Sequence, residues 1–600
     1  MTCYKNLREF LNALDKAGEI AYVRHPVSPY LEISKLTDRE SKAPDGGKAL
    51  FFENVENSSF PVVTNIFGSP RRICMALGTD HLDQIAARIR KYIDFNPPRN
   101  LKEAWNTLPI ALDLAKFPPR MFRGKTPPCQ EVILTGDKAD LSKLPVLHCW
   151  PKDAGPFITL PLVFTRSLVS GKRNVGMYRM QIFDKNSTGM HWHIHKDGSH
   201  YFNEYRNAGK RMPVAVAIGA DPAAIYSATA PLPRGVDEML LAGFIRKKPV
   251  ILAKCLTVAL EVPAEAEFVL EGYVNPDELR REGPFGDHTG YYSLADDYPV
   301  FHVTAITHRR DAVYNATLVG PPPMEDCYLA KATERIFLPM LQAVFPEIQD
   351  YWFPWEGVFH NIVIVSIEKE YPGHAQKIMS GLWGQGQMSF CKAIVVADKT
   401  LNPQNPEEVI KALVTKSDIG TDITLTKGVL DVLDHSSPLP NFGNKIGIDL
   451  TQRYKGEPPR ILVPKPRLAN EKNRISDIAD VIRDKIEGII NCRPLFQGVS
   501  AEETCVNRFL ALSVEKTKNR RGKEFAESLF DAAELYGFNI FILFDKDIDL
   551  SDGSLMLWKL FNNTDPGRDM IFRDGRLLID ACRKGLMDGH GREWPDELRF

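Results

Sequence analysis

An internal repeat in the C-terminal part of this chain constrains its fold more than any other feature. Residues 362–369 read IVIVSIEK, and residues 509–516, which lie 147 positions later, read FLALSVEK. Polar positions recur at the same offset, or at 131 near the end of the repeat: Asp398 with Asp545, Lys399 with Lys546, and Asp449 with Asp580. Chance similarity between two strand–helix–strand units is the alternative, but the shared register favours duplication. We therefore expect two copies of one α/β domain, at 319–465 and 474–600.

Size and composition indicate a soluble protein with several domains. At 600 residues the chain is too long for one core, and 44% of its residues are hydrophobic and 25% charged. The formal net charge of −1 gives no electrostatic support for a nucleic-acid or anionic-membrane partner. No apolar run approaches the length of a membrane span, so no stable membrane insertion is expected. Ten cysteines without a Cys-x-x-Cys pair suit the reducing cytoplasm.

Hydrophobic periodicity divides the remaining sequence into two regions. Residues 1–115 are predicted to form an N-terminal α/β domain. Within it, Leu7–Ala17 and His81–Ile93 have helical periodicity, and Ile20–Val23 resembles a strand. Short β-rich runs dominate residues 116–318, which favours a barrel or a sandwich. The clearest runs are Ile158–Phe164, Tyr178–Phe183, Val214–Ile218 and Phe301–Ile306.

Two carboxylates, Glu282 and Asp287, flank a Gly-Pro-Phe-Gly sequence. Glycine lets the backbone approach a ligand closely and proline fixes one dihedral angle, so such a loop can hold both acids at one cleft. Paired carboxylates in different environments are a common source of a general acid or base near neutral pH. A solvated turn with acidic side chains is the alternative, and the flanking Phe285 and Tyr291 favour a partly buried loop.

Three imidazoles alternate at His191, His193 and His195, which would place them on one face if this segment is a strand. His-x-His is also a geometry for metal binding, and Asn174 and Glu238 are candidate partners. Amide and carboxylate oxygens together with imidazole suit Mn²⁺ or Mg²⁺. A polar sheet face with hydrogen-bonded histidines is the alternative.

Arg179 lies between apolar neighbours in a β-rich run. A buried guanidinium without a partner is costly, so this side chain must find an anion or a cluster of carbonyls. A structural salt bridge and a site for a substrate carboxylate are both compatible with the sequence.

Together these residues resemble the UbiD-like decarboxylases, a family that uses prenylated FMN. The family motifs are an Asn followed five residues later by an Arg, a downstream His, a Glu that opens an apolar helix, and the loop Glu-Gly-Pro-(Phe/Tyr)-Gly-(Asp/Glu). Their matches here are Asn174 and Arg179, His195, Glu238, and 282–287. The resemblance runs in order from about Tyr4 to Arg453. The sequence departs from it at Lys196-Asp197-Gly198, where members of the ubiquinone branch tend to have Arg-Gly-Gly.

The resemblance implies an α+β protein with an N-terminal α/β unit, a central split β-barrel that binds the flavin, and a C-terminal α/β domain, here in two copies. It implies prenylated FMN and Mn²⁺ as cofactors, with K⁺ as an optional further ion. Asn174, His195 and Glu238 would hold the metal against the flavin phosphate. The residues implied to bind the cofactor are Asn174, Met177, Tyr178, Arg179, His191, Trp192, His193, Lys196 and Asp197.

The implied activity is reversible, non-oxidative decarboxylation of an aromatic or α,β-unsaturated carboxylic acid. Glu282 would be tuned by Arg179, and Asp287 would deliver the proton that replaces CO₂. Long members resemble the branch in ubiquinone and menaquinone biosynthesis, with a hydroxybenzoate or dihydroxynaphthoate as substrate, and catabolism of phenolic acids is equally compatible. A flavin prenyltransferase would supply the cofactor, and a homo-oligomer is expected.

Two other functions stay open on the sequence. His191, His193 and His195 could serve a flavin-independent metal-dependent hydrolase or a cupin-like enzyme, which would be colourless and contain zinc. The chain could also be an inactive subunit of a larger carboxylase, although its complete set of candidate site residues argues against this. The second C-terminal copy has no counterpart of those residues, which predicts a structural role for it.

Overall fold

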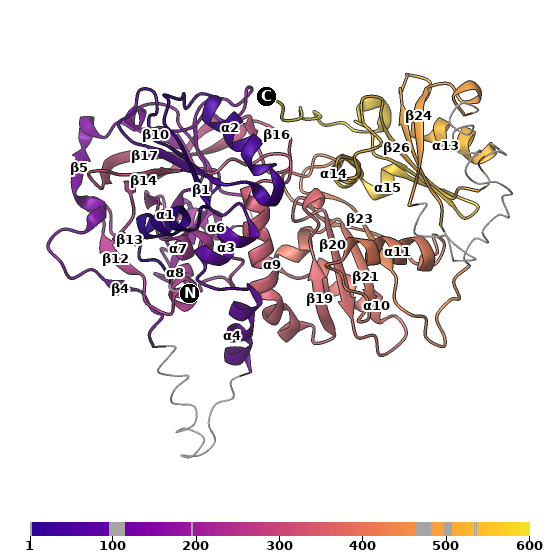
Figure 1. Cartoon of the computed structure of the whole chain (residues 1–600), viewed down its shortest axis with the longest axis horizontal. Coiled ribbons are helices and arrows are strands. Elements are labelled where there is room, and N and C mark those ends of the chain that lie inside the picture. The colour runs from indigo at the N-terminus through magenta and orange to yellow at the C-terminus, as the bar shows by residue number, and fades with distance from the viewer. Residues whose placement is uncertain are drawn as a thin grey trace, which may run out of the picture. The chain divides into compact units, whose positions relative to one another are not determined.

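The computed structural model of the chain divides into two compact units, whose elements are labelled in Figure 1. Unit 1 comprises Met1–Pro339 together with Asp596–Phe600, and unit 2 comprises Met340–Pro595. The structure describes residues 3–94, 115–193, 196–461, 482–496, 507–532, 535 and 537–600. His195 and the predicted junction between the two C-terminal copies, at 465–474, lie outside these ranges.

The N-terminal part of unit 1 is built on a four-stranded sheet of order β1-β2-β3-β18. Its strands are β1 (Ile20–Val23), β2 (Ala49–Phe52), β3 (Val62–Thr64) and β18 (Tyr314–Asn315). The helices described in this part are α1 (Leu7–Lys16), α2 (Glu32–Ser41), α3 (Pro70–Ala76) and α4 (Asp83–Ile93). α1 begins where the Asn6 side chain accepts a hydrogen bond from the Glu9 amide, and it buries Phe10 and Leu14. The helices and the strand predicted for this region are confirmed.

A larger sheet forms the centre of unit 1, with the order β10-β17-β14-β11-β7-β8 and with β5 paired to β17. Its strands are β5 (Val132–Thr135), β7 (Leu162–Arg166), β8 (Arg173–Gly176), β10 (Ser187–Gly189), β11 (Met212–Ile218), β14 (Phe268–Glu282) and β17 (Asp296–His308). Neighbouring strands are antiparallel. Within the described residues this path does not close on itself, so the sheet is not a closed barrel, and the split form stays a prediction.

Shorter elements complete unit 1. They are β4 (Arg120–Met121), β6 (Phe157–Ile158), β9 (Met180–Gln181), β12 (Ile251–Lys254), β13 (Glu261–Pro263), β15 (Phe285–Gly286), β16 (Tyr292–Ser293), α6 (Asp197–Asn207), α7 (Pro222–Ser227) and α8 (Glu238–Arg246). The strand predicted over 178–183 is limited to β9, because β9 pairs only with the short β6. Residues 191–193 lie in no strand, so the condition under which His191 and His193 would share one strand face is not met.

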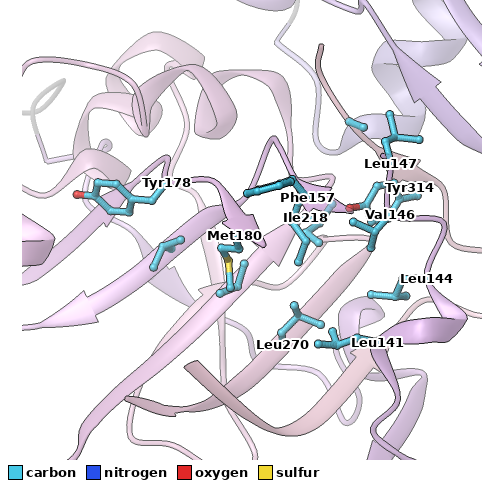
Figure 2. Close-up of a cluster of buried hydrophobic side chains, with 14 of the residues drawn as sticks. Leu141, Leu144, Val146, Leu147, Phe157, Tyr178, Met180, Ile218, Leu270 and Tyr314 are labelled. Atoms are coloured by element: carbon cyan, nitrogen blue, oxygen red, sulfur yellow. The ribbon is translucent and has the colours of Figure 1, made fainter. Parts of the chain in front are cut away.

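Buried side chains on either side of Arg179 anchor this segment to the core. Tyr178 and Met180 belong to a cluster that also contains Phe157, Ile218 and Leu270 (Figure 2). Burial of a large apolar side chain contributes roughly 1.5–3 kcal/mol relative to exposure. Because both neighbours of Arg179 are anchored in this way, packing restricts the backbone that carries the guanidinium.

Unit 2 contains two five-stranded sheets of identical topology. The first, in the order β19-β20-β21-β23-β22, consists of β19 (Ile348–Trp352), β20 (Ile362–Ile367), β21 (Ala393–Asp398), β22 (Ile423–Val429) and β23 (Phe442–Asp449). The second, in the order β24-β25-β26-β28-β27, consists of β24 (Ile489–Leu495), β25 (Phe509–Val514), β26 (Ile540–Asp545), β27 (Met570–Arg573) and β28 (Arg576–Asp580). In both sheets the three inner strands are parallel and both edge strands are antiparallel.

The α-helices that the structure describes in the C-terminal part are α9 (Glu325–Val344), α10 (His374–Trp383), α11 (Pro406–Lys416), α13 (Gly522–Asp531), α14 (Gly553–Asn563) and α15 (Pro566–Asp569). α11 and α14 begin at residues with the sequence offset of 147, as do β20 and β25. Among the helices of the described ranges, none combines the length and the apolar character that a membrane span requires.

Candidate active site

A short hairpin brings the two candidate acids into reach of one arginine. β14 ends at Glu282, and after Gly283 and a cis-Pro284 the chain forms β15, which pairs with β16. Gly283 has a φ of +88°, a region that favours glycine, and its amide donates to the Gln181 side chain at 2.8 Å. Asp287 follows β15 directly. Residues 285–293 are called the acid hairpin below.

The Arg179 guanidinium binds both carboxylates. Its Nε donates to Glu282 Oε1 at 3.1 Å, and Nη1 pairs with Asp287. Nη2 donates to Ser293 Oγ at 2.9 Å, and the guanidinium lies 4.8 Å from the centroid of the Phe285 ring. Side-chain exposure is 8% for Arg179, 0% for Glu282 and 12% for Asp287, so this is a buried charge cluster. Arg179 therefore meets carboxylates, one of the partners expected from the sequence.

Charge pairing decides the protonation state of both acids. Burial disfavours the charged form of Glu282, but Arg179 and His191 outweigh it and lower the pKa of this carboxyl to about 2. Burial likewise opposes ionisation of Asp287, and Arg179 and His288 hold its pKa well below the usual range. Desolvation would lower the pKa of Arg179, but the two carboxylates raise it. At neutral pH the cluster therefore holds two carboxylates and one guanidinium.

His191 extends the cluster by two hydrogen bonds. Its Nδ1 lies 2.7 Å from Glu282 Oε2, and its Nε2 lies 2.9 Å from His193 Nε2. Burial, reinforced by Arg179, lowers the pKa of His191, so the ring is neutral. Since an ionised Glu282 can only accept, we infer that Nδ1 carries the proton and that Nε2 accepts from His193. The ring of His191 also lies against that of Tyr298, with centroids 4.1 Å apart.

Two of the three predicted metal ligands lie on adjacent elements, β8 and α8. Glu238 Oε2 accepts a hydrogen bond from the Val175 amide at 2.8 Å, next to Asn174, whose Nδ2 donates to Thr165 Oγ1 at 3.3 Å. Burial raises the pKa of Glu238 to about 8. The described residues contain no cluster of three or more His, Cys, Asp or Glu side chains that could hold a metal, and His195 lies outside them. A divalent cation would offset the burial of Glu238, so the two oxygen-bearing side chains fit Mn²⁺.

The residues implied to bind a flavin lie on two segments of the sequence, 174–179 and 191–197. Tyr178 and Trp192 are buried, and Trp192 Nε1 has no hydrogen-bond partner within the described residues, which suits a polar atom of a ligand. Gly198, the second residue of α6, packs against both rings, since a Cβ there would come within 2.8 Å of Trp192. These features fit a bound flavin.

The other cofactor candidates are placed as follows. The Met177 amide donates to the Ala228 carbonyl at 3.2 Å. Lys196 is the N-cap residue of α6, although its side chain makes no capping bond. Asp197 pairs with Arg234 at 3.1 Å, so its charge is used within the protein. Their roles toward a cofactor stay predictions.

Asp153 is a site residue that sequence reasoning missed. Its carboxylate accepts from the Gly286 amide at 2.7 Å and from the Trp150 amide at 2.8 Å, and it thereby ties the acid hairpin to Trp150. Burial raises the pKa of Asp153 to about 7. Its local sequence, Pro-Lys-Asp-Ala-Gly, is typical of a surface turn, so no signal distinguished it.

Comparison with protein-family models matches three parts of the chain to domains of 3-octaprenyl-4-hydroxybenzoate carboxy-lyase. The N-terminal domain matches residues 11–89, the Rift-related domain 120–322, and the C-terminal domain 327–450 and 498–581. These matches include the acid hairpin and Arg179. The chain belongs to the UbiD family of carboxy-lyases.

Relatives of two lengths match the sequence. A protein of Archaeoglobus fulgidus is 49% identical over 456 residues, which are 76% of this chain and 93% of the relative. A protein of Helicobacter pylori is 38% identical over 98% of this chain and 94% of its own length. The part of the chain without a counterpart in the first relative is therefore largely matched in the second.

Two solved structures show the same fold. The UbiD-class enzyme HmfF from Pelotomaculum thermopropionicum, in complex with FMN, has a TM-score of 0.64 and 29% identity, and the match covers 78% of this chain and 99% of HmfF. The vanillic acid decarboxylase of Sedimentibacter hydroxybenzoicus, in its closed form, has a TM-score of 0.67 and 26% identity, with coverage of 81% and 99%.

Proposed function

We propose that this chain reversibly decarboxylates an aromatic or α,β-unsaturated carboxylic acid with prenylated FMN as its cofactor. The observation that carries the proposal is the buried cluster in which Arg179 binds both Glu282 and Asp287. A guanidinium recognises carboxylates through paired hydrogen bonds, so Arg179 can exchange one carboxylate partner for that of a substrate. The FMN complex of HmfF and the aromatic substrate of the vanillic acid decarboxylase support this choice of cofactor and substrate.

The two acids take different roles in this proposal. Glu282 keeps its charge because it is bound by Arg179 Nε and His191 Nδ1 together. The charge of Asp287 depends more on a single contact with Arg179 Nη1, which is supplemented by hydrogen bonds from His288. A substrate carboxylate at Arg179 would weaken that contact and add negative charge, and both effects raise the pKa of Asp287. Asp287 would then take up a proton and deliver it to the carbon that CO₂ leaves.

Asn174, His195 and Glu238 would hold Mn²⁺ at the flavin phosphate, and K⁺ is a further candidate ion. When bound, prenylated FMN supplies an electron sink at the carbon that loses CO₂. The buried rings of Tyr178 and Trp192 would exclude water and orient the cofactor, with Trp192 Nε1 available as a donor.

The biological setting that we propose is small-molecule metabolism in the cytoplasm. A hydroxybenzoate or dihydroxynaphthoate of quinone biosynthesis is a candidate substrate. A flavin prenyltransferase would supply the cofactor, and the chain would form a homo-oligomer. The hydrolase alternative is less well supported, because the Nδ1 and Nε2 atoms of His191 lie within hydrogen-bond distance of Glu282 and His193.

Co-expression with a flavin prenyltransferase tests the proposed function. We expect mass spectrometry of the purified protein to detect the modified flavin. A screen of aryl and acrylic acids should then show CO₂ release from at least one substrate. A colourless protein that contains zinc and no flavin would rule out the proposal.

Glu238→Ala should remove the metal and weaken flavin retention, because it deletes the one anionic side chain among the three proposed ligands. We expect bound Mn²⁺, measured by elemental analysis, to fall at least tenfold, and flavin content to fall with it. Glu407→Ala is a matched control, since Glu407 is also an acid in the first turn of a helix but is exposed. Full metal and flavin content in the Glu238 variant would contradict the assignment.

The second proposal is that unit 2 consists of two copies of one domain. Besides the identical topology, polar contacts recur at equivalent positions. These are Asp418 N to Asp422 with Asp565 N to Asp569; Thr451 N to Asp449 with Cys582 N to Asp580; Gln452 N to Asp398 with Arg583 N to Asp545; and Lys369 to Glu457 with Lys516 to Asp588. That one family model matches 327–450 and 498–581 also supports duplication.

Contacts between the two copies are reciprocal. Before β20, Asn361 Nδ2 donates to Asn562 Oδ1 near the end of α14 at 3.0 Å. Before β25, the Asn507 amide donates to the Val414 carbonyl near the end of α11 at 2.8 Å, and its side chain donates to the Ser417 carbonyl at 2.7 Å. Each copy thus uses the same two regions toward the other, which is the pattern of a twofold-symmetric dimer.

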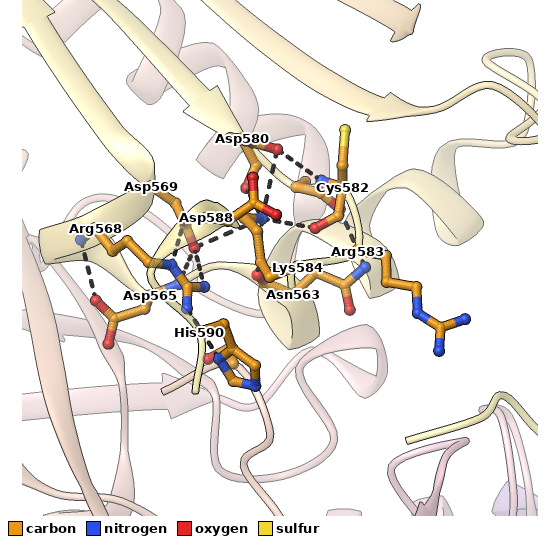
Figure 3. A network of polar contacts seen from close by, with 12 residues as sticks. Asn563, Asp565, Arg568, Asp569, Asp580, Cys582, Arg583, Lys584, Asp588 and His590 are labelled. Carbon is orange, nitrogen blue, oxygen red and sulfur yellow. Dashed lines mark hydrogen bonds and ion pairs between the residues drawn. The ribbon is translucent and has the colours of Figure 1, made fainter. Parts of the chain in front are cut away.

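A structural role for the second copy predicts the effect of Lys584→Met. Lys584 is buried near Asp580 and Asp569, and its Nζ donates to the Cys582 carbonyl at 2.6 Å (Figure 3). Leaving those carboxylates without this cation should lower the free energy of unfolding by about 3 kcal/mol. The kcat of Lys584→Met, measured at a temperature below its unfolding transition, should equal that of the wild type.

The matched control is Lys546→Met, because Lys546 and its partner Glu515 are both more than half exposed, at 59% and 53%. Such a surface pair contributes little, so the free energy of unfolding of this variant should stay close to that of the wild type. A loss of kcat in folded Lys584→Met would contradict a purely structural second copy.

A further inference from the structure

A segment that is distant in sequence pairs with the acid hairpin through an isolated antiparallel bridge. Residues 596–600, called the tail segment here, belong to unit 1 although they follow unit 2 in the sequence. The Tyr292 amide donates to the Asp596 carbonyl at 2.9 Å, and the Leu598 amide donates to the Gly290 carbonyl at 3.0 Å. Tyr291 and Glu597 form an antiparallel bridge between these two bonds. The tail segment is therefore paired with the half of the hairpin that follows Asp287.

Two side chains of the tail segment contact the core of unit 1: Leu598 is buried, whereas Phe600 keeps 41% of its surface exposed and makes its contact through its ring. Leu598 is 5% exposed and belongs to the same buried cluster as Trp150 and Phe285. The Phe600 ring stacks on the Trp150 ring, with centroids 4.3 Å apart and planes at 26°. The Arg599 side chain, between them in sequence, is 69% exposed.

The hairpin backbone at Gly286 packs closely against the side chains of Trp150 and Leu598. A Cβ on Gly286 would lie 2.2 Å from Trp150 Cδ1 and 2.8 Å from Leu598 Cδ2. The Gly286 amide is held by Asp153, which also binds the Trp150 amide. The residue after Gly286 is Asp287, whose amide donates to the Tyr291 carbonyl at 3.1 Å. The tail segment thus contacts the hairpin both before and after Asp287 in the sequence, at Gly286 and at 290–292.

We infer that the tail segment is a positioning element of the active site: it holds the acid hairpin against Trp150 and fixes the carboxylate of Asp287. This inference rests on the proposed function of Asp287 as the proton donor. Leu598 and Phe600 are positioning residues, since they act through the hairpin and Trp150. The ion pair of Lys152 with Asp596, at 2.7 Å, adds little because both side chains are at least half exposed.

The test is a full-length chain compared with one that stops after Pro595, both loaded with prenylated FMN. Small displacements of a catalytic group can lower a rate by up to about a hundredfold. We expect kcat to fall at least tenfold while KM and flavin content stay within twofold. Amide hydrogen exchange at Tyr292, which loses its acceptor, should accelerate at least tenfold, and the amides of β11 should exchange as before.

Point variants keep the test decisive where the shortened chain does not fold. Leu598→Ala and Phe600→Ala should each lower kcat severalfold, and Phe600→Trp, which keeps a stacked ring, should restore it. Arg599→Ala is the matched control from the same segment and should leave kcat unchanged.

Two results would overturn the inference: full kcat in the shortened, folded chain, or unchanged exchange of the Tyr292 amide, whose acceptor is the Asp596 carbonyl. The exchange measurement needs no substrate. Failure of the proposed function, seen as a wild-type protein without flavin or CO₂ release, is therefore distinguishable from failure of the positioning role.

Discussion

Asp287→Asn should lower kcat by about a thousandfold while the flavin stays bound. General acid catalysis by a positioned side chain typically contributes a hundredfold to ten-thousandfold, and an amide cannot deliver the proton. Asn is close in size to Asp, and Glu282 still pairs with Arg179 at 3.1 Å, so the site should keep its shape. Flavin content by absorbance and CO₂ release under saturating substrate provide the measurement.

The control for this variant is Asp296→Asn. Asp296 is the register partner of Glu282 on β17, yet its side chain is 75% exposed and its distance to Arg281 is 4.0 Å. We expect this variant to retain nearly full kcat. Wild-type CO₂ release by Asp287→Asn would exclude Asp287 as the proton donor. Loss of flavin from that variant would show that the residue serves cofactor binding instead.

Arg179→Met should both inactivate and destabilise the protein. Removing one partner of a buried ion cluster leaves uncompensated charge and typically costs about 3–5 kcal/mol. The substrate carboxylate also loses its proposed partner, so we expect kcat/KM to fall below detection. Urea unfolding at pH 7 measures the stability loss. Arg281→Met, which removes an exposed guanidinium next to Glu282, should change stability by less than about 1 kcal/mol.

The pH dependence of stability should change sign in the Arg179 variant. In the wild type the pKa of Glu282, about 2, lies below that of an unfolded glutamate, about 4.3. Its stabilisation is therefore complete above the unfolded value and is lost as the pH falls toward 2. Without Arg179, burial dominates and raises the pKa of both carboxyls above their unfolded values. The folded variant then binds protons more tightly, so its deficit relative to wild type should shrink as the pH falls from 7 to 4.

A deficit that stays constant over this pH range would contradict the electrostatic account. The combination of Arg179→Met with Glu282→Gln and Asp287→Asn provides a second check. The triple variant has no charge at these three buried positions. It should therefore recover part of the stability that Arg179→Met alone loses.

Site residues could be predicted from the sequence where local backbone preferences bring them together, but not where only the fold does so. Glu282 and Asp287 are separated by a Gly-Pro-Phe-Gly sequence whose backbone preferences are local, so their convergence could be expected. Arg179 could be predicted to need an anion, because a buried guanidinium is costly, but only the fold shows that its partners are these two acids. Asp153 could not be found, since one of its two partners, the Gly286 amide, is 133 residues away in sequence and meets it only in the folded chain.

Secondary structure was predictable where periodicity was long and uninterrupted, as in α1. The alternating histidines did not decide the secondary structure, because a period of two indicates a strand only if a neighbouring strand offers a ladder, and residues 191–193 lie in no strand. His191 and His193 nevertheless meet through their ring nitrogens at 2.9 Å. For the repeat in unit 2, apolar and acidic residues recur at a constant sequence offset, and this pattern predicted equivalent strands in the two copies. Such a pattern is informative because the register of a strand fixes which of its side chains are buried.

The pairing of Gly290 with Leu598 has a consequence for how this protein matures. These residues are about 300 positions apart, and contacts of such separation form late because loop-closure entropy opposes them. A ribosome that adds 5–20 residues per second needs roughly 15–60 s between synthesis of the acid hairpin and synthesis of the tail segment. During that interval the nascent chain carries Arg179, Glu282 and Asp287 without the tail segment that pairs with the acid hairpin. Nicking by a protease between the two segments would put a finished molecule at risk of returning to that state.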